Sequence, residues 1–286
     1  MAEAEVTGGP SSAGMSSETS EFVTVDGIRL RVRVRGSGPP LLLVMGLGGS
    51  IELWDPLVEA IEGRETIAYD APGTGESELP GRPLSMSQLA AVADGLVLQL
   101  GYDRVDLLGV SFGGAVAQQL AFQAPGRVGR LILAATACGL GAVPGNPLAM
   151  AALFTPYRYY SRRHLELVAP FLYGGGAGEP TLTDQQALAR LHRPPSLRGY
   201  YMQLMAMAGW SSLPFLRSIR QPTLVMAGDD DPIVAPANGQ ILARLIPDAR
   251  LHVVKGGGHL FLIDRARESA DVIEQFLGSD VAREPD

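Results

Sequence analysis

Short apolar runs alternate with helical patterns along most of the chain. Two neighbouring runs, 22–25 and 28–35, flank an Asp-Gly dipeptide that is typical of a tight hairpin turn. Helical patterns lie between the later runs, at 113–123, 235–245 and 267–277 among others. This alternation predicts an α/β fold, in which a mostly parallel, eight-stranded sheet carries helices on both faces. The continuous apolar runs that predict its buried strands are 41–45, 66–69, 105–110, 128–134, 223–227 and 251–254.

The second run of the hairpin carries arginine at every other position, at Arg29, Arg31, Arg33 and Arg35. A period of two predicts one dry and one wet face, as in a strand near the edge of a sheet. A stripe of arginines also suggests an anion-binding face, but a solvated strand face is the simpler interpretation. We therefore expect these four side chains to face solvent.

The regular alternation stops between 139 and 220. That stretch holds aromatic residues, methionine, proline and a glycine run, and it lacks clear strands. We interpret it as a helical cap inserted into the α/β domain. The N-terminal segment is rich in Ser, Gly, Glu and Ala, so it cannot bury enough apolar surface to offset its ordering entropy. The predicted core is 21–138 and 221–279, the cap is 139–220, the disordered tail is 1–20, and a second tail is 280–286.

Composition narrows the function classes. The chain has 286 residues, of which 46% are hydrophobic, and a net charge of −7. It lacks the basic cluster that a phosphate backbone requires, so we expect no nucleic-acid partner. Because Cys138 is the only cysteine, we expect no internal disulfide and no thiolate metal cage. No window predicts a membrane-spanning helix, and the N-terminus lacks the apolar run of an export signal, so we expect a cytoplasmic protein.

A G-x-S-x-G motif at 109–113 makes Ser111 the candidate nucleophile. The motif alone is weak, because glycine and serine are common. Its context is specific, since it follows an apolar strand and opens the helix predicted from Gly113. This setting is typical of the nucleophile elbow of α/β-hydrolases, where a strained turn raises the serine hydroxyl clear of the sheet. The alternative is a glycine-rich helix entry with an idle serine.

The same architecture requires a histidine in a loop after the last strand. His259 fits, because it follows a run of three glycines shortly after the predicted strand 251–254. The other histidines fit less well: His164 and His192 lie in the predicted cap, and His252 lies within a strand. We therefore expect His259 to act as the base.

The acid of the triad should lie beyond the predicted strand 223–227. Asp229, Asp230 and Asp231 follow this strand directly. Some α/β-hydrolases place the acid after the preceding strand, but residues 135–138 contain no carboxylate. Three adjacent carboxylates repel one another and cannot all reach one imidazole, so one of the three is the candidate acid.

The loop after the first buried strand, 45–49, reads Met-Gly-Leu-Gly-Gly. We expect the backbone amides of Leu47 and Phe112 to form an oxyanion hole, aimed at the negative oxygen of the reacting carbonyl. A dinucleotide-binding loop is the alternative, but its third glycine would fall at Ile51. The turn 70–77 matches D-x-x-G-x-G-x-S, and we interpret it as structural.

With these motifs placed, the chain from about residue 22 resembles intracellular poly(3-hydroxyalkanoate) depolymerases that act on medium-chain-length polymer. The core motifs are shared by a large superfamily, whereas the cap segments are more specific, because caps vary with substrate. The similar segments include Val110-Ser111-Phe112-Gly113-Gly114-Ala115, Val143-Pro144-Gly145, Arg158-Tyr159, Tyr173-Gly174-Gly175-Gly176, Gly209-Trp210 and Gly258-His259-Leu260-Phe261.

The resemblance implies serine-dependent hydrolysis of a polyester to 3-hydroxy acids. The family pattern G-x-x-D implies Asp231 as the acid, with Asp230 as the second choice. No metal or organic cofactor is implied. The chain departs from the family at Phe112, where tryptophan is usual, and at Met45, where asparagine is frequent, which leaves the preferred acyl chain length open.

An apolar cap would line a substrate channel. We expect Met45, Phe154, Tyr201 and Trp210 to contact the substrate, with packing inside the cap as the alternative for most of them. The expected partner is a polyester or a small ester, and the cap is a candidate surface for docking on a polymer granule. The sequence leaves the oligomeric state open.

Two other functions remain. The first is a small-molecule esterase, enol-lactonase or carbon–carbon bond hydrolase that uses the same triad. The second is a non-catalytic ligand-binding receptor of this fold, against which an intact triad argues. Ser111 argues against haloalkane dehalogenases and epoxide hydrolases, because those enzymes carry aspartate at this position.

Overall fold

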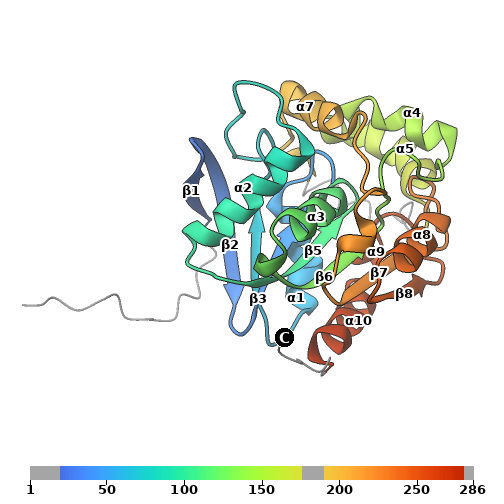
Figure 1. Cartoon of the computed structure of the whole chain (residues 1–286). Coiled ribbons are helices and arrows are strands. Elements are labelled where there is room, and N and C mark those ends of the chain that lie inside the picture. Colours follow the sequence, from blue (N-terminus) through green and yellow to red (C-terminus); the bar gives the residue numbers. More distant parts are fainter. Residues whose placement is uncertain (1–19, 176–189, 280–286) are drawn as a thin grey trace, which may run out of the picture.

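A computed structural model describes residues 20–175 and 190–279 (Figure 1). Eight strands form one sheet in the order β1-β2-β4-β3-β5-β6-β7-β8. β2 runs antiparallel to both of its neighbours, and every other pair is parallel. The predicted eight-stranded sheet is confirmed, with strand ends within two residues of expectation. The strands are β1 (Glu21–Val25), β2 (Ile28–Gly36), β3 (Pro40–Val44), β4 (Glu65–Tyr69), β5 (Val105–Val110), β6 (Val128–Ala134), β7 (Thr223–Gly228) and β8 (Ala249–Val254).

The Asp-Gly dipeptide forms the hairpin turn between β1 and β2. Asp26 and Gly27 have φ angles of 50° and 79°, and Val25 pairs directly with Ile28. A two-residue hairpin with positive φ at both central positions matches the right-handed twist of its strands. Aspartate and glycine adopt that conformation at low cost, so the turn follows from local sequence alone.

Two hydrophobic layers lie on opposite faces of the sheet. Along β3, Leu42 and Val44 join one layer, while Leu41 and Leu43 join the other. Burial on both faces explains why the central strands are continuous apolar runs rather than alternating ones. The first layer packs against α2 (Met86–Gln99), α3 (Phe112–Gln123) and α8 (Ala237–Leu245), and the second against α1 (Asp55–Ala60), α9 (Phe261–Asp264) and α10 (Ala266–Gly278).

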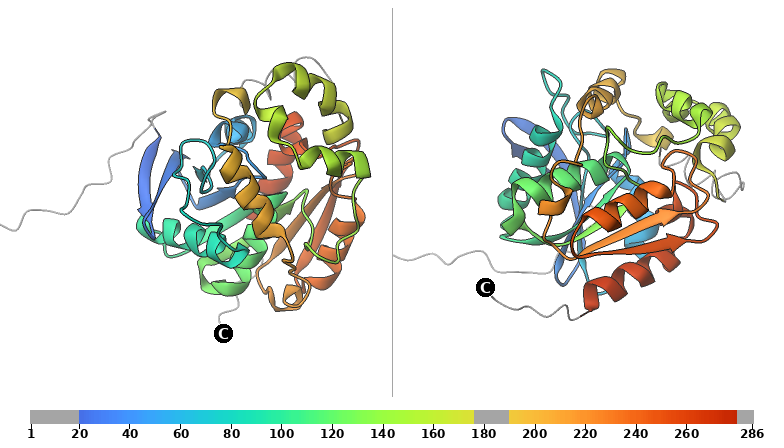
Figure 2. Two further views of the ribbon diagram at one scale, coloured as in Figure 1. Left: turned by 90° about the horizontal axis from the view of Figure 1, so that it is seen from above. Right: turned by 45° about the vertical axis from the view of Figure 1, so that its right-hand side comes forward.

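Between β6 and β7 the described chain forms helices joined by loops and contributes no strand to the sheet. We call residues 139–175 and 190–220 the cap segment. The helices of the cap segment are α4 (Pro147–Leu153), η3 (Pro156–Tyr159), α5 (Arg162–Tyr173), α7 (Leu197–Met207) and η4 (Leu216–Ser218). Its helices α4, η3, α5 and α7 lie over one end of the sheet (Figures 1 and 2), whereas η4 packs beside α3 and α8. The division into core and cap remains a prediction, and most of both predicted tails lies outside the described residues.

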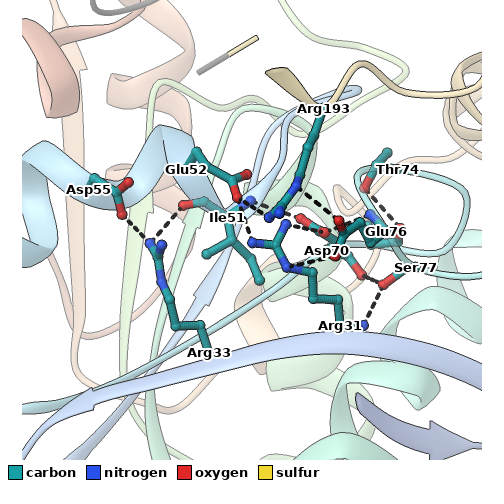
Figure 3. Close-up of polar contacts among 11 residues, drawn as sticks. Arg31, Arg33, Ile51, Glu52, Asp55, Asp70, Thr74, Glu76, Ser77 and Arg193 are labelled. Atoms are coloured by element: carbon teal, nitrogen blue, oxygen red, sulfur yellow. Dashed lines mark hydrogen bonds and ion pairs between the residues drawn. The ribbon is translucent and has the colours of Figure 1, made fainter. Parts of the chain in front are cut away.

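The arginine stripe on β2 is not a solvated face. The Arg31 and Arg33 side chains are only 3% and 7% exposed. Carboxylates from η1 (Ile51–Trp54), from Asp55 directly after it and from the turn 70–77 fold over the strand and pair with them (Figure 3). The prediction of exposed side chains is therefore wrong for these two residues, because a strand's own period cannot show that a distant segment will cover its polar face.

The described residues contain no helix that is both long enough and apolar enough to cross a membrane.

Candidate active site

Ser111 sits at a sharp bend between β5 and α3. Its φ and ψ angles are 53° and −118°, a combination that costs energy for any residue with a Cβ. The bend is held from both sides, because the Ser111 amide donates to the Ala134 carbonyl (2.9 Å) and the Thr136 hydroxyl donates to the Ser111 carbonyl (2.7 Å). The side chain of Ser111 consequently lines a cavity at the end of the sheet.

The glycines of G-x-S-x-G are present for steric reasons. A Cβ at Gly113 would lie 2.0 Å from the Val44 carbonyl oxygen, and a Cβ at Gly109 would lie 2.4 Å from the Gly113 carbonyl oxygen. No real Cβ tolerates such contacts with backbone. The motif therefore allows β3, β5 and α3 to approach one another closely enough to place the serine beside the loop after β3.

Ser111, His259 and Asp231 are linked by hydrogen bonds. The distance from His259 Nε2 to Ser111 Oγ is 3.0 Å, and that from His259 Nδ1 to Asp231 Oδ2 is 2.8 Å. The other oxygen of Asp231 accepts from the amides of Ile233 and Val234, both at 2.9 Å. Because a carboxylate faces Nδ1, the neutral ring carries its proton there and leaves Nε2 free to accept from the serine.

The three adjacent aspartates have separate partners. Asp230 accepts from the amide of Gly175 (2.7 Å) in the cap segment. Asp229 accepts from the amide of Gly256 (2.5 Å) and forms an ion pair with Lys255 (3.4 Å). Asp231 alone bonds the imidazole, and its side chain is 1% exposed. The second choice, Asp230, instead joins the acid loop to the cap segment.

The loop 45–49 lies directly beside the serine. A Cβ at Gly46 would lie 3.4 Å from Ser111 Cβ, and the Gly49 amide donates to the Gly46 carbonyl at 3.1 Å. Phe112 is the first residue of α3, so its amide has no acceptor within the helix. The amides of Leu47 and Phe112 thus belong to the two segments that flank Ser111.

A cavity enclosing about 600 Å³ of non-atom space, part of it open to solvent, contains Ser111 and His259. Its wall is largely apolar, with two arginines from the cap segment. The other lining residues are Met45, Gly46, Leu47, Gly49, Leu53, Trp54, Val110, Leu153, Arg158, Tyr159, Tyr173, Arg190, Ile233, Leu260, Leu262 and Ile263.

Of the four residues expected to contact the substrate, one lies at this cavity. Met45 lines the cavity, whereas Phe154, Tyr201 and Trp210 do not. The Trp210 indole donates to Gln119 (2.8 Å), and the Tyr201 hydroxyl donates to the Phe154 carbonyl (3.1 Å). The apolar character of a cap residue does not show which side of its helix faces the cavity, and these three residues lie outside the lining of this cavity.

Leu53, Trp54 and Arg158 also line the cavity and were not predicted. Leu53 and Trp54 follow the loop 45–49 in sequence, and this proximity is the one signal that could have revealed them. Arg158 lies 3% exposed, with its guanidinium 4.7 Å from the centre of the Tyr159 ring and 2.9 Å from the Tyr200 hydroxyl. Nothing in the local sequence indicates that this arginine is buried.

The residues that the structure describes contain no group of three or more His, Cys, Asp or Glu side chains suited to a metal ion.

Comparison with known proteins identifies the family. The model of the alpha/beta hydrolase family matches residues 41–272. The chain belongs to the α/β-hydrolase family. This α/β-hydrolase is 43% identical over 260 residues to a poly(3-hydroxyalkanoate) depolymerase of Ectopseudomonas oleovorans, covering 89% of this chain and 91% of that one. The predicted fold and the predicted resemblance are thereby confirmed.

Two further relatives are hydrolases with other substrates. This α/β-hydrolase is 31% identical to a 2-hydroxy-6-oxo-6-phenylhexa-2,4-dienoate hydrolase of Burkholderia cepacia, covering 85% of this chain and 91% of that one. The crystal structure of an enol-lactonase from Burkholderia xenovorans LB400 superposes with a TM-score of 0.78 at 27% identity, covering 91% of this chain and all of that one.

Proposed function

We propose that this α/β-hydrolase cleaves carboxylic esters, with Ser111 as nucleophile, His259 as general base and Asp231 as the group that orients the imidazole. The observation that carries the proposal is the continuous set of hydrogen bonds from Asp231 through His259 to Ser111, which ends in an apolar cavity. A hydroxyl paired with an imidazole that a carboxylate orients is an activated nucleophile.

The reaction proceeds in two halves. His259 Nε2 takes the proton of Ser111 as Oγ attacks the ester carbonyl, and the amides of Leu47 and Phe112 hold the negative oxygen. When the tetrahedral intermediate collapses, the alcohol leaves with the proton from Nε2, and the acyl group stays on Oγ. A water molecule then gives a proton to Nε2 and attacks the acyl carbonyl. Collapse of this second intermediate returns the proton to Oγ and releases the acid.

The proposed substrate is a poly(3-hydroxyalkanoate) with apolar side chains. Leucine, isoleucine, tryptophan and tyrosine side chains dominate the cavity wall, so an alkyl side chain next to the scissile ester would be buried on binding. The 43% identical relative, whose name states this activity, supports the same substrate. This proposal places the protein in the cytoplasm, beside an intracellular polymer.

The decisive experiment measures release of 3-hydroxy acids from suspended medium-chain and short-chain polymer. We expect the wild type to degrade the medium-chain polymer and Ser111→Ala to release nothing above background. Ser211→Ala is a matched control, because the Ser211 hydroxyl bonds the Leu140 carbonyl in the cap segment instead of the imidazole. Equal turnover by wild type and Ser111→Ala would exclude the serine mechanism.

The cap segment also supports docking on a polymer granule. Among the described residues, most of the large apolar side chains that remain exposed belong to it. They include Leu148 on α4 and Leu167 and Phe171 on α5, which are 75%, 68% and 68% exposed. Soluble monomers rarely leave so many apolar side chains in one region without a partner. A water-insoluble polyester is a large apolar surface that these side chains would contact.

A small anionic substrate is the second candidate, and the two arginines of the cavity wall favour it. Arg158 and Arg190 place positive charge beside an otherwise apolar cavity that contains Ser111. The relatives named as an enol-lactonase and as a dienoate hydrolase indicate which small substrates to test for this candidate function. Turnover of short soluble esters or dienoates with none on polymer would select it. Absence of turnover and of fluorophosphonate labelling would indicate a binding protein instead.

A further inference from the structure

One peptide group of the loop 45–49 is bonded at both of its polar atoms by the cap segment. The carbonyl of Leu47 accepts a hydrogen bond from the Tyr159 hydroxyl at 2.6 Å. The amide of Gly48, at the other end of the same peptide, donates to the Gln203 side-chain oxygen at 2.9 Å. Tyr159 lies in η3 and Gln203 in α7, so two separate elements of the cap segment hold this single peptide.

The neighbouring peptide is the one that carries the proposed oxyanion donor. Its carbonyl, that of Gly46, accepts from the Gly49 amide at 3.1 Å. In a trans peptide the carbonyl and amide point in opposite directions, so this bond turns the Leu47 N–H away from the interior of the loop. Gly46 itself lies against Ser111, with a Cβ there only 3.4 Å from Ser111 Cβ.

The loop has little stiffness of its own. Three of its five residues are glycines, and Gly48 has a φ of +71°. Glycine adopts several backbone conformations at similar cost, so rotation of the peptide between Leu47 and Gly48 would meet only a small local barrier. Its orientation therefore depends on the two bonds from the cap segment.

Packing around these two bonds is tight. A Cβ at Gly48 would lie 2.8 Å from the Tyr200 ring and 3.2 Å from the Tyr159 ring, so both rings rest on the loop. Arg158 holds the rings together, through its bond to the Tyr200 hydroxyl and its position over the Tyr159 ring. Gln203 is 3% exposed, so water does not readily replace its oxygen as the acceptor for Gly48.

We propose that Tyr159 and Gln203 are positioning residues that hold the Leu47–Gly48 peptide and thereby aim the Leu47 N–H at the reacting oxygen. The cap segment then has a second task besides enclosing the substrate: the oxyanion hole is complete only when the cap segment rests on the loop. This inference depends on the proposed function, because it takes Leu47 as an oxyanion donor.

The test compares Tyr159→Phe and Gln203→Met with Tyr201→Phe, using a soluble medium-chain p-nitrophenyl ester. Tyr201 is a matched control, since its hydroxyl bonds the Phe154 carbonyl and not the loop. We expect kcat to fall about 10- to 100-fold in the first two variants with KM within about twofold, because an oxyanion donor acts in the transition state. Gln203→Glu keeps the acceptor oxygen and should recover most of kcat.

A trifluoromethyl ketone supplies a second readout, because it forms a tetrahedral anion on Ser111. Its inhibition constant should rise by the same factor by which kcat/KM falls, whereas a neutral alcohol inhibitor should bind all variants alike. Unchanged kcat, or a raised KM alone, in both variants would overturn the proposal. Ser111→Ala distinguishes failure of the proposed function from failure of the positioning role. If Ser111→Ala stays active, the proposed function fails. If it is inactive while Tyr159→Phe and Gln203→Met keep the wild-type kcat, only the positioning role fails.

Discussion

Ser111 occupies a backbone conformation that residues with a Cβ rarely adopt. The glycines around it pack so closely against other atoms that no side chain would fit at their positions. Gly109 and Gly113 each abut a carbonyl oxygen, and Gly114 abuts the Thr136 side chain. The conformation of the elbow therefore depends on the absence of single Cβ atoms, so a glycine-to-alanine substitution is enough to test it.

Gly113→Ala should destabilise the fold by about 2 kcal/mol or more, because its Cβ would meet the Val44 carbonyl at 2.0 Å. Esterase activity should fall as well, since relief of the clash moves α3 and the Phe112 amide. Gly126→Ala is the matched control, because nothing lies within 4 Å of a Cβ at that position. Chemical denaturation measures the free energy of unfolding of both variants. Equal stability of the two variants would contradict this account of the motif.

Asp231→Asn should lower kcat on the order of 10³- to 10⁴-fold, because an amide no longer stabilises the charged imidazole or selects its tautomer. Asp230→Asn provides the comparison, since the Asp230 carboxylate accepts from the Gly175 amide in the cap segment instead of bonding the imidazole. We expect it to retain most activity. Steady-state kinetics on a soluble ester distinguish the two; a greater loss in Asp230→Asn would reassign the acid.

At the scale of elements, buried ion pairs join β2, η1 and the turn 70–77 (Figure 3). Asp70 accepts from the amides of Ile51 and Glu76, at 2.8 and 2.9 Å. A Cβ at Gly75 would lie 2.0 Å from the Asp70 carboxylate, which explains the second glycine of D-x-x-G-x-G-x-S. The turn thus holds η1 in place, and with it two residues of the cavity wall.

Glu52 lies at the centre of these ion pairs. Its carboxylate accepts from Arg31 (2.5 Å) and from Arg193 of the cap segment (2.7 Å). Burial alone would raise the pKa of Glu52, but the hydrogen bond and charge of Arg31 outweigh it and lower the pKa to about 2. The cap segment is therefore tied to the core at a carboxylate that stays ionised well into the acid range.

The lowered pKa of Glu52 predicts an acid-dependent loss of stability. A depressed carboxyl pKa stabilises the fold fully above the unfolded value of about 4.5, and this stabilisation disappears as the pH falls towards 2. The ionised Glu52 carboxylate thus contributes up to about 3 kcal/mol to the free energy of unfolding. Glu52→Gln should be less stable at pH 7 and should lose less between pH 5 and 2. Urea denaturation at several pH values measures this, and parallel curves for the two proteins would contradict it.

At the scale of the whole molecule, the cap segment contacts three of the loops that form the candidate site. The His259 amide donates to the Tyr173 carbonyl (2.6 Å), and a Cβ at Gly174 would lie 2.1 Å from the Asp230 carbonyl. Together with the bonds to Leu47 and Gly48, these contacts link the cap segment to the loops after β3, β7 and β8. Substrate enclosure and catalytic geometry consequently depend on the same contacts.

The exposed apolar side chains of the cap segment predict granule docking that is separable from catalysis. Leu167→Gln combined with Phe171→Gln should weaken co-sedimentation with polymer granules several-fold while leaving turnover of soluble esters unchanged. Leu98→Gln on α2 is the control, because Leu98 is also half exposed but lies outside the cap segment. Docking through apolar contacts should persist at high salt, whereas charge-driven docking would weaken. Equal co-sedimentation of all variants would exclude this surface.

The sequence by itself predicted the strands along the chain to within two residues, the hairpin turn, and Ser111 and His259 as candidate catalytic residues. The strands, the turn and the elbow depend on local patterns: apolar runs, an Asp-Gly dipeptide, and glycines beside a serine at a strand-to-helix bend. His259 follows instead from the fold, which requires a histidine after the last strand. Local backbone and side-chain sterics produce the strands, the turn and the elbow wherever the surrounding core is apolar enough.

The resemblance already implied Asp231 as the acid, whereas the tertiary structure alone decided the separate partners of Asp229 and Asp230, which cap side chains line the cavity, and that Arg31 and Arg33 are buried. Each of these depends on contacts between segments far apart in the chain, such as Arg193 with Glu52 or Tyr159 with Leu47. The hydrophobic period of a helix or strand describes one segment at a time. It does not show which distant segment will pack on that element or on which face.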